Sequence, residues 1–407
     1  MLKLILGADW TANRKWMLEA ISSDVHSKKP NRVLMVPELI SHDTERRLCG
    51  TAGATASRYA EVLSFSRLAR RVADAAGHGA ISCLDEGGRV VAMAAAINQI
   101  QSRLKSFAAV GRQPEFISDL LAIVDEFKRC CVDSGALMEA SGKASGVLAQ
   151  KLEELALIAE SYDSICSRGK KDPMDQMTWL LEELECSDYA ASHVFYIDGF
   201  PDFTRQHMAI LEHLVCTSPE VVVSLNCDAL DSTDPAFEAP ADTAKELLRI
   251  ARAKGVQYQI LQVEPEIGRA GSVARKLFQG DLCCQHSLSL TASRFDSVFN
   301  ECEAVAEHIL ETVRAGCRFR DISVVCGDMG AYRSAVNMVF KRCGIPVYVS
   351  GTESILDKPV IATVLSALDA ALGGFEQREV LRYLKTALSP LELRECDLIE
   401  NYVLLWG

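Results

Sequence analysis

The sequence predicts an α/β protein built on a parallel sheet, with a large helical insertion and part of a second α/β unit. Five short apolar runs in the first half of the chain have the form of strands that are buried on both faces of a sheet. Helical segments separate the first three runs, and another separates the last two, as in doubly wound folds. Over a hundred residues between the third and fourth runs have helical periodicity throughout.

The predicted strands are bounded by turn residues or charges; they are LKLILG (2–7), NRVLMVP (31–37), AEVLSFS (60–66), HVFYIDGF (193–200) and PEVVVSLNC (219–227). In the helical insertion, Pro114 and Pro173 stand near helix starts, where proline is tolerated. The acidic stretch 228–243 contains two prolines and predicts an exposed loop. A helix over 243–254 and a strand at VQYQILQV (256–263) are expected to follow.

A second α/β unit is predicted where the pattern resets, around residues 280–288. Its elements are the run SLSLTAS (287–293), a helix over 299–315, a strand over 321–327, a helix over 331–343, a strand over 345–351 and further helices. The predicted domains are therefore a sheet domain in two parts (1–75 and 191–280), a helical insertion (76–190) and a partial second unit (281–407). Because the chain stops at LLWG without a terminating element, we expect a longer parent protein.

Composition narrows the functional classes. No apolar run approaches the ~20 residues that cross a membrane, and there is no secretory signal, so no membrane association and a cytoplasmic location are expected. The 15 cysteines lack Cys-x-x-Cys spacing, which argues against a metal site and favours free, mostly buried thiols.

The net charge is −12 and basic residues occur in small groups. A DNA-binding role would therefore need a partner that supplies part of the positive charge.

The opening strand and the helix that follows it have the form of a phosphate-binding loop. Such a loop reads G-x-x-x-x-G-K-[ST], in which glycines let backbone N–H groups cradle phosphates, the lysine reaches the β/γ-phosphates and the hydroxyl binds Mg²⁺. With Gly7 as the first glycine, Ala12 takes the second position, Asn13 the lysine and Arg14 the hydroxyl. Trp10 adds a bulky ring inside the loop. The strand–loop–helix form survives, but the phosphate chemistry does not.

Asp198 follows the fourth strand, where a P-loop fold places the acid that holds Mg²⁺. Together with the opening segment it favours a P-loop fold. In the absence of a lysine, Asp198 is either a relic or a partner for Arg14, and we expect Trp10 to fill the empty pocket. No catalytic residue is predicted in this chain. The Glu-x-Lys spacing at Glu126 and Lys128 resembles that of metal-dependent nucleases, but it lies in a segment of helical period, so a nuclease site is not expected there.

Several segments in order resemble a known family: LMVPE, EVLSFSRLARRV, YIDGFPDFTRQHMAILEHL, FRDISVVCGD and LKTALSPLELRECDLIENYVL. They are similar to the amino-terminal part of the B subunit of bacterial AddAB-type (RexAB-type) ATP-dependent helicase–nucleases. The resemblance implies a superfamily 1 helicase-like organisation, with a RecA-like domain carrying a helical insertion and then part of a second RecA-like domain. Many family members keep a loop of the form GRAGSGKT, from which Asn13 and Arg14 depart.

The same resemblance implies partners and cofactors. Such B subunits act with a motor A subunit on double- and single-stranded DNA at double-strand breaks, for recombinational repair. ATP and Mg²⁺ then belong to the motor subunit, and the iron–sulphur cluster belongs to a carboxy-terminal nuclease domain beyond this chain. No cofactor is therefore expected here.

DNA-contact candidates also follow from the resemblance. They are Ser64, Ser66 and Arg67 after the third strand, and Gln206 in the IDGFPDFTRQ segment. For Ser66, the alternative is that it caps the next helix. Two other hypotheses for the chain stay open: an active P-loop NTPase with a reshaped nucleotide site, and an unrelated nucleotide-fold enzyme that binds a small metabolite.

Overall fold

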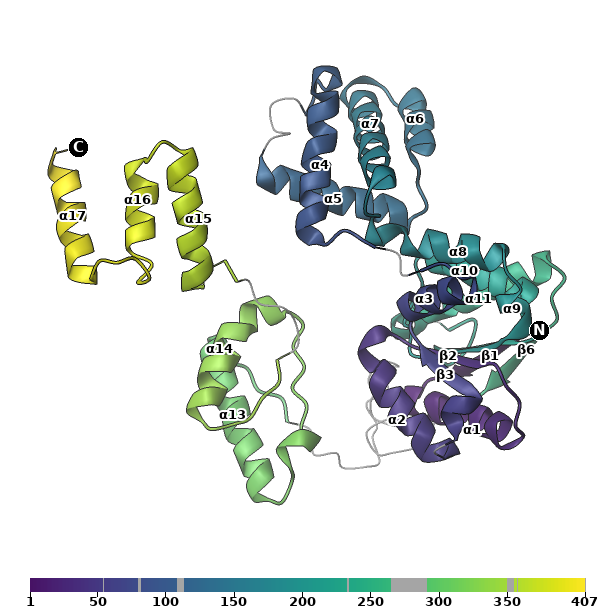
Figure 1. Ribbon diagram of the computed structural model, residues 1–407. Coiled ribbons are helices and arrows are strands. Elements are labelled where there is room, and N and C mark those ends of the chain that lie inside the picture. The colour runs from purple at the N-terminus through teal and green to yellow at the C-terminus, as the bar shows by residue number, and fades with distance from the viewer. Residues whose placement is uncertain are drawn as a thin grey trace. The chain divides into compact units, whose positions relative to one another are not determined.

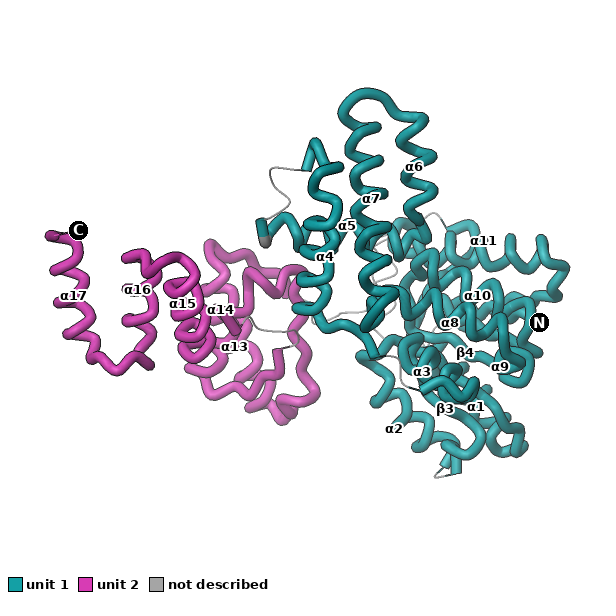
Figure 2. The backbone as a smooth tube through the Cα atoms, turned by 45° about the horizontal axis from the view of Figure 1, so that its top comes forward, with its two compact units in different colours: residues 1–289 teal, residues 290–407 magenta. Residues whose placement is uncertain are grey.

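The computed structural model describes residues 1–53, 55–79, 82–107, 113–232, 234–264, 291–349, 355–356 and 358–406. The chain divides into two compact units, Met1–Ser289 and Leu290–Gly407, shown in teal and magenta in Figure 2. The predicted boundary at residue 280 lies outside the described residues. The finer division of the chain into four domain segments stays a prediction.

A parallel sheet lies at the centre of the first unit (Figure 1). It has six strands in the order β3-β2-β4-β5-β1-β6. All six strands lie where the sequence predicts them: β1 (Leu2–Gly7), β2 (Arg32–Met35), β3 (Ala60–Leu63), β4 (Val194–Ile197), β5 (Val221–Asn226) and β6 (Tyr258–Gln262). Side chains along β1 alternate between two cores, with Leu2, Leu4 and Leu6 on one face and Ile5 on the other. Burial on both faces explains the unbroken apolar runs.

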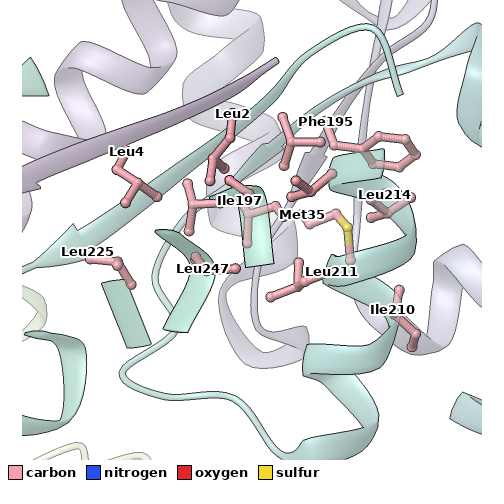
Figure 3. Packing of buried hydrophobic residues seen from close by; sticks show 14 of the residues in the cluster. Leu2, Leu4, Met35, Phe195, Ile197, Ile210, Leu211, Leu214, Leu225 and Leu247 are labelled. Atoms are coloured by element: carbon pink, nitrogen blue, oxygen red, sulfur yellow. The ribbon is translucent and has the colours of Figure 1, made fainter. Parts of the chain in front are cut away.

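Helices cover both faces of this sheet, which gives the α/β fold that the sequence predicts (Figure 1). One face carries α1 (Trp10–His26) and α2 (Ser41–Ala52), and the other carries α3 (Phe65–Ala75), α8 (Gln176–Glu185), α9 (Tyr189–Ser192), α10 (Arg205–Thr217) and α11 (Glu238–Ala253). Figure 3 shows the second core, where Phe195 and Ile197 of β4 pack against Leu211 and Leu214 of α10.

A helical region follows the third strand, as predicted. It contains α4 (Glu86–Ile100), α5 (Pro114–Arg129), α6 (Ser134–Lys143) and α7 (Gly146–Arg168), and α4, α5 and α7 enclose a core of their own. The two connections to the sheet run side by side, since Leu84 N donates to Lys171 O at 2.8 Å and Lys171 N donates to Ser82 O at 3.0 Å. The helices α8 and α9, at the end of the predicted insertion (76–190), contribute Leu180, Leu184 and Ala190 to the core against the sheet.

The stretch 228–243, predicted to be a loop, is helical in its second half. A short 3-10 helix, Pro235–Phe237, is capped by Asp234, and α11 begins directly after it at Glu238. The loop prediction is wrong here because Pro240 lies in the first turn of α11, where proline breaks no helical hydrogen bond. Pro240 is buried.

The second unit is helical where it is described, with α13 (Val298–Arg314), α14 (Met329–Arg342), α15 (Pro359–Leu372), α16 (Gln377–Leu384) and α17 (Leu393–Trp406). The strands predicted over 321–327 and 345–351 are not formed by 322–327 and 345–349. Val325 and Tyr348 are 92% and 90% exposed. A strand requires a neighbour for its backbone hydrogen bonds, and the described residues of this unit supply none. The run SLSLTAS lies partly outside the described residues.

Candidate functional site: the end of the first strand

The turn between β1 and α1 is too short for a phosphate cradle. The strand ends at Gly7 and the helix begins at Trp10, which leaves Ala8 and Asp9 between them. Asp9 is the N-cap, and its carboxylate accepts a hydrogen bond from Thr11 N at 2.9 Å. The Asp9 carboxylate therefore compensates the positive charge at the N-terminus of α1. In a P-loop, the corresponding helix N-terminus binds phosphate.

Asn13 fills the space behind this turn. Its side chain is buried, and Nδ2 donates to Gly7 O at 3.0 Å and to Leu225 O at 3.2 Å. The amide thus joins the ends of β1 and β5. A Cβ atom at Gly7 would lie 2.1 Å from Asn13 Oδ1, so the two residues pack in direct contact. At the position where a P-loop carries lysine, this chain has a side chain bound to its own backbone.

Arg14 forms a buried ion pair with Asp198, which confirms the pairing that the sequence suggested. Arg14 Nε lies 2.9 Å from Asp198 Oδ2, and the two side chains are 10% and 7% exposed. Asp198 follows β4, and its backbone N–H donates to Met35 O at 3.0 Å. Gly199 comes next with φ +81°, and a Cβ there would lie 3.0 Å from Arg14 Nη2. The acid at the position that holds Mg²⁺ in a P-loop fold is therefore neutralised by a guanidinium of the same chain.

The prediction that Trp10 fills the pocket is wrong. Its side chain is 55% exposed, and its ring lies over the Arg14 guanidinium, with 4.8 Å between Cζ and the ring centroid. Asn13 and Arg14 are buried and occupy the interior positions next to the strand ends, which leaves the indole on the outer side. The contact is a cation–π interaction rather than a core contact.

The turn after β3 contains three of the predicted site residues in a second polar group. Ser64 is the N-cap of α3 and accepts a hydrogen bond from Arg67 N at 3.2 Å. Its hydroxyl donates to Glu38, which also pairs with Arg67, Nε to Oε1 at 3.2 Å. Ser66 is exposed in the first turn of α3, so the capping role considered for Ser66 belongs to Ser64. Sequence reasoning missed Glu38, although an acid directly after a predicted strand (LMVPE) is a usable signal.

Gln206, the fourth DNA-contact candidate, lies in the first turn of α10 and is buried. Its Nε2 points towards Met174 O at 3.4 Å and Thr178 Oγ1 at 3.5 Å. The structure therefore leaves Ser66 exposed and Arg67 exposed but paired with Glu38, while Ser64 and Gln206 are buried. Contact with DNA at these positions stays a prediction.

Lys128 belongs to a buried ion cluster at the base of the helical region. Its Nζ lies 2.9 Å from Asp172 Oδ2, 2.7 Å from Asp175 Oδ1 and 3.1 Å from Asp163 Oδ1. Burial acts to lower the pKa of Lys128, but the three carboxylates outweigh it and raise that pKa. Lys128 and Glu126 lie on α5, as the helical period indicated, and the ion pairs of Lys128 join the helical region to its connection with the sheet.

Comparisons with known proteins identify the family. A family model described as "ADDB, N-terminal" matches residues 4–274. The chain is 26% identical over its whole length to the B subunit of an ATP-dependent helicase/deoxyribonuclease from Clostridium acetobutylicum, covering 36% of that protein. It is 27% identical to the protein of the same name from Acetivibrio thermocellus, covering all of this chain and 37% of the relative. For the Caldanaerobacter subterraneus protein of that name, identity is 28% over 92% of this chain and 34% of the relative.

The chain thus spans about a third of the length of the curated relatives it matches. None of its described helices combines the length and apolar character needed to cross a bilayer. The family match extends over the six-stranded sheet, the helical region and the self-paired turn, which is the turn after β1 (Ala8 and Asp9) together with the Arg14–Asp198 ion pair. The chain belongs to the ADDB N-terminal family.

Proposed function

We propose that this chain is the helicase-like region of the B component of a helicase–nuclease, and that it acts as a DNA-guiding scaffold whose nucleotide site is occupied by its own side chains. The observation that carries the proposal is the pairing of Arg14 with Asp198. In a P-loop, Mg²⁺ is bound at two positions, by a hydroxyl and by an acid. The Arg14–Asp198 ion pair occupies both of these positions. Asn13 places no charge against a phosphate and is held by two backbone carbonyls.

Three further parts of the proposal rest on the family. A motor subunit supplies ATP hydrolysis, the complex processes double-strand breaks for recombinational repair in the cytoplasm, and DNA passes over this region on its way to the nuclease. The relatives are named as one subunit of an ATP-dependent helicase/deoxyribonuclease, which supports a partner. Family membership argues against an unrelated metabolite-binding enzyme. The remaining rival is an NTPase with a reshaped nucleotide site.

Calorimetry with millimolar Mg-ATP tests the self-occupied site. We expect neither heat of binding nor a thermal shift, because opening the site would leave Arg14 and Asp198 buried and unpaired, at a cost of about 3–5 kcal/mol. Asp198→Asn removes the charge with little change of shape. Asp242→Asn, which removes an exposed carboxylate on α11, is the matched control. Binding by the unaltered chain that Asp198→Asn abolishes and Asp242→Asn preserves would favour the NTPase instead.

A further inference from the structure

A groove lies between α1 and α2, beside the turn that joins β1 to α1. It has a volume of about 450 Å³, and its lining includes Trp10, Arg14 and Lys15 of α1 and Arg47 and Gly50 of α2. A cavity of this size falls within the ~300–1,000 Å³ range of small-ligand sites and accommodates one nucleotide unit. No Cβ contact within 4 Å would arise at Gly50, so this wall of the groove is open.

The indole of Trp10 is a fixed aromatic surface at one side of this groove. Its ring is held against the Arg14 guanidinium, which is held in turn by Asp198. More than half of the side chain is in solvent. An aromatic ring whose support is buried loses little conformational freedom when a flat ligand stacks on it. The ion pair that blocks the nucleotide site therefore also orients Trp10.

The cations beside the indole favour an anionic ligand. Lys15 and Arg47 line the groove, and Glu19 is its one acidic lining residue among the described part of the chain. Arg47 Nε pairs with Asp43 Oδ2 at 2.7 Å on the same helix. Both side chains are over half exposed (53% and 55%), and exposed pairs of this kind are weak and screened by salt. A phosphate can therefore compete for the Arg47 guanidinium.

We propose that this groove binds single-stranded DNA, with one base stacked on Trp10 and the neighbouring phosphates near Lys15 and Arg47. The inference rests on the proposed DNA-guiding function and adds a site to it. An unpaired strand is required because duplex pairing keeps base faces inside the stack. A protein ligand fits less well, because Trp10 and Leu18 are the only large apolar residues that line the groove in the described chain.

Binding of a labelled ten-nucleotide oligo(dT) to the 407-residue chain, followed by fluorescence anisotropy at low salt, tests the site. Trp10→Ala should weaken binding by roughly 5- to 150-fold, as expected for the loss of one base–aromatic stack. Trp10→Phe should retain more affinity than Trp10→Ala, because it keeps a ring. Arg47→Ala should make the dependence of affinity on salt less steep by about one ion. Arg46→Ala, its exposed neighbour that does not line the groove, should leave the slope unchanged.

Quenching of intrinsic fluorescence shows which tryptophan is contacted. Oligo(dT) should quench the chain and its Trp406→Phe variant, which alters another exposed indole, but not the Trp10→Phe variant. Unchanged oligo(dT) affinity in Trp10→Ala would overturn the proposal, as would the absence of any oligo(dT) binding. Equal quenching by dTMP at the same concentration would assign the groove to free nucleotides instead. Unchanged oligo(dT) affinity in Trp10→Ala would remove this site alone and leave the self-occupied nucleotide site, which Mg-ATP calorimetry tests independently; the absence of all oligo(dT) binding would also count against the DNA-guiding function.

Discussion

Gly7 and Asn13 act as one packing unit at the end of β1. In a phosphate-binding loop the first glycine leaves backbone room for phosphate. Here the room at Gly7 is taken by the carboxamide of Asn13, whose Oδ1 would lie 2.1 Å from an added Cβ. That oxygen is buried and has no hydrogen-bond partner within the described residues. The glycine is thus needed for a contact within the protein rather than for a ligand.

We expect Gly7→Ala to lower the free energy of unfolding by about 1–3 kcal/mol, the usual cost of overpacking a tight site. Urea denaturation of the chain measures this change. In the background of Asn13→Ala the cost of Gly7→Ala should fall, since the closest atom is removed. Gly142→Ala, in helix α6 with no neighbour within 4 Å, serves as the control and should be neutral or stabilising. Equal effects at Gly7 and Gly142 would contradict the packing argument.

At the scale of single elements, Glu154 joins α7 to the segment that follows α4. Its carboxylate accepts hydrogen bonds from the backbone N–H groups of Lys105, Ser106 and Phe107, at 3.1, 2.8 and 3.1 Å. Burial acts to raise the pKa of Glu154, but these backbone donors outweigh it and lower that pKa below its ordinary value of 4.5. One side chain therefore satisfies three backbone donors between two helices.

A lowered pKa in the folded state means that this carboxylate stabilises the fold above pH 4.5 and that the contribution is lost as the pH falls through the folded value. We expect Glu154→Gln to destabilise the chain by about 2 kcal/mol at pH 7 and to reduce the acid sensitivity of its unfolding. Chemical denaturation at pH 7 and at pH 4 measures both effects. Glu160→Gln, an exposed position on the same helix, should change neither.

The sequence predicts best the strands that helices cover on both faces of the sheet. The runs at β1 and β5 are apolar without alternation because helices cover both faces of the sheet, so they are recognisable without any partner. The runs over 321–327 and 345–351 carry the same apolar signal, yet their described residues form no ladder. A strand depends on a neighbour that a local pattern does not contain.

Over the whole molecule, the net charge of −12 sets the expected behaviour towards DNA. We expect the chain alone to bind duplex ends weakly and with steep salt dependence, because few phosphates can be neutralised. Addition of the motor subunit should tighten the binding greatly. Anisotropy titrations of a labelled duplex at several salt concentrations, with and without that subunit, measure this. Nanomolar binding by the chain alone at physiological salt would contradict it.

The sequence offers the Arg14–Asp198 pairing as one of two possibilities for Asp198, and it does not predict the geometry of the candidate site. Aligning the first helix with a phosphate loop places Arg14 opposite Asp198, because the carboxyl ends of parallel strands share one edge of the sheet. The exposure of Trp10 depends on how Asn13 and Arg14 fill the interior, which no local pattern records. The cysteines give the same lesson: the expectation of mostly buried thiols is wrong for the described residues, since Cys166 and Cys227 are buried whereas Cys49, Cys186 and Cys216 are exposed.

The adjoining connections at Ser82–Leu84 and Lys171 make the helical region exchangeable. The chain leaves and rejoins the sheet at neighbouring positions that are hydrogen-bonded to each other. Insertions or deletions of residues between these two points therefore alter the size and reach of the helices, while the order and register of the six strands are untouched. A different module grafted between the same two residues would keep the fold only if it again supplied cations to the fully buried Asp172, which Arg89 and Lys128 of this region now pair.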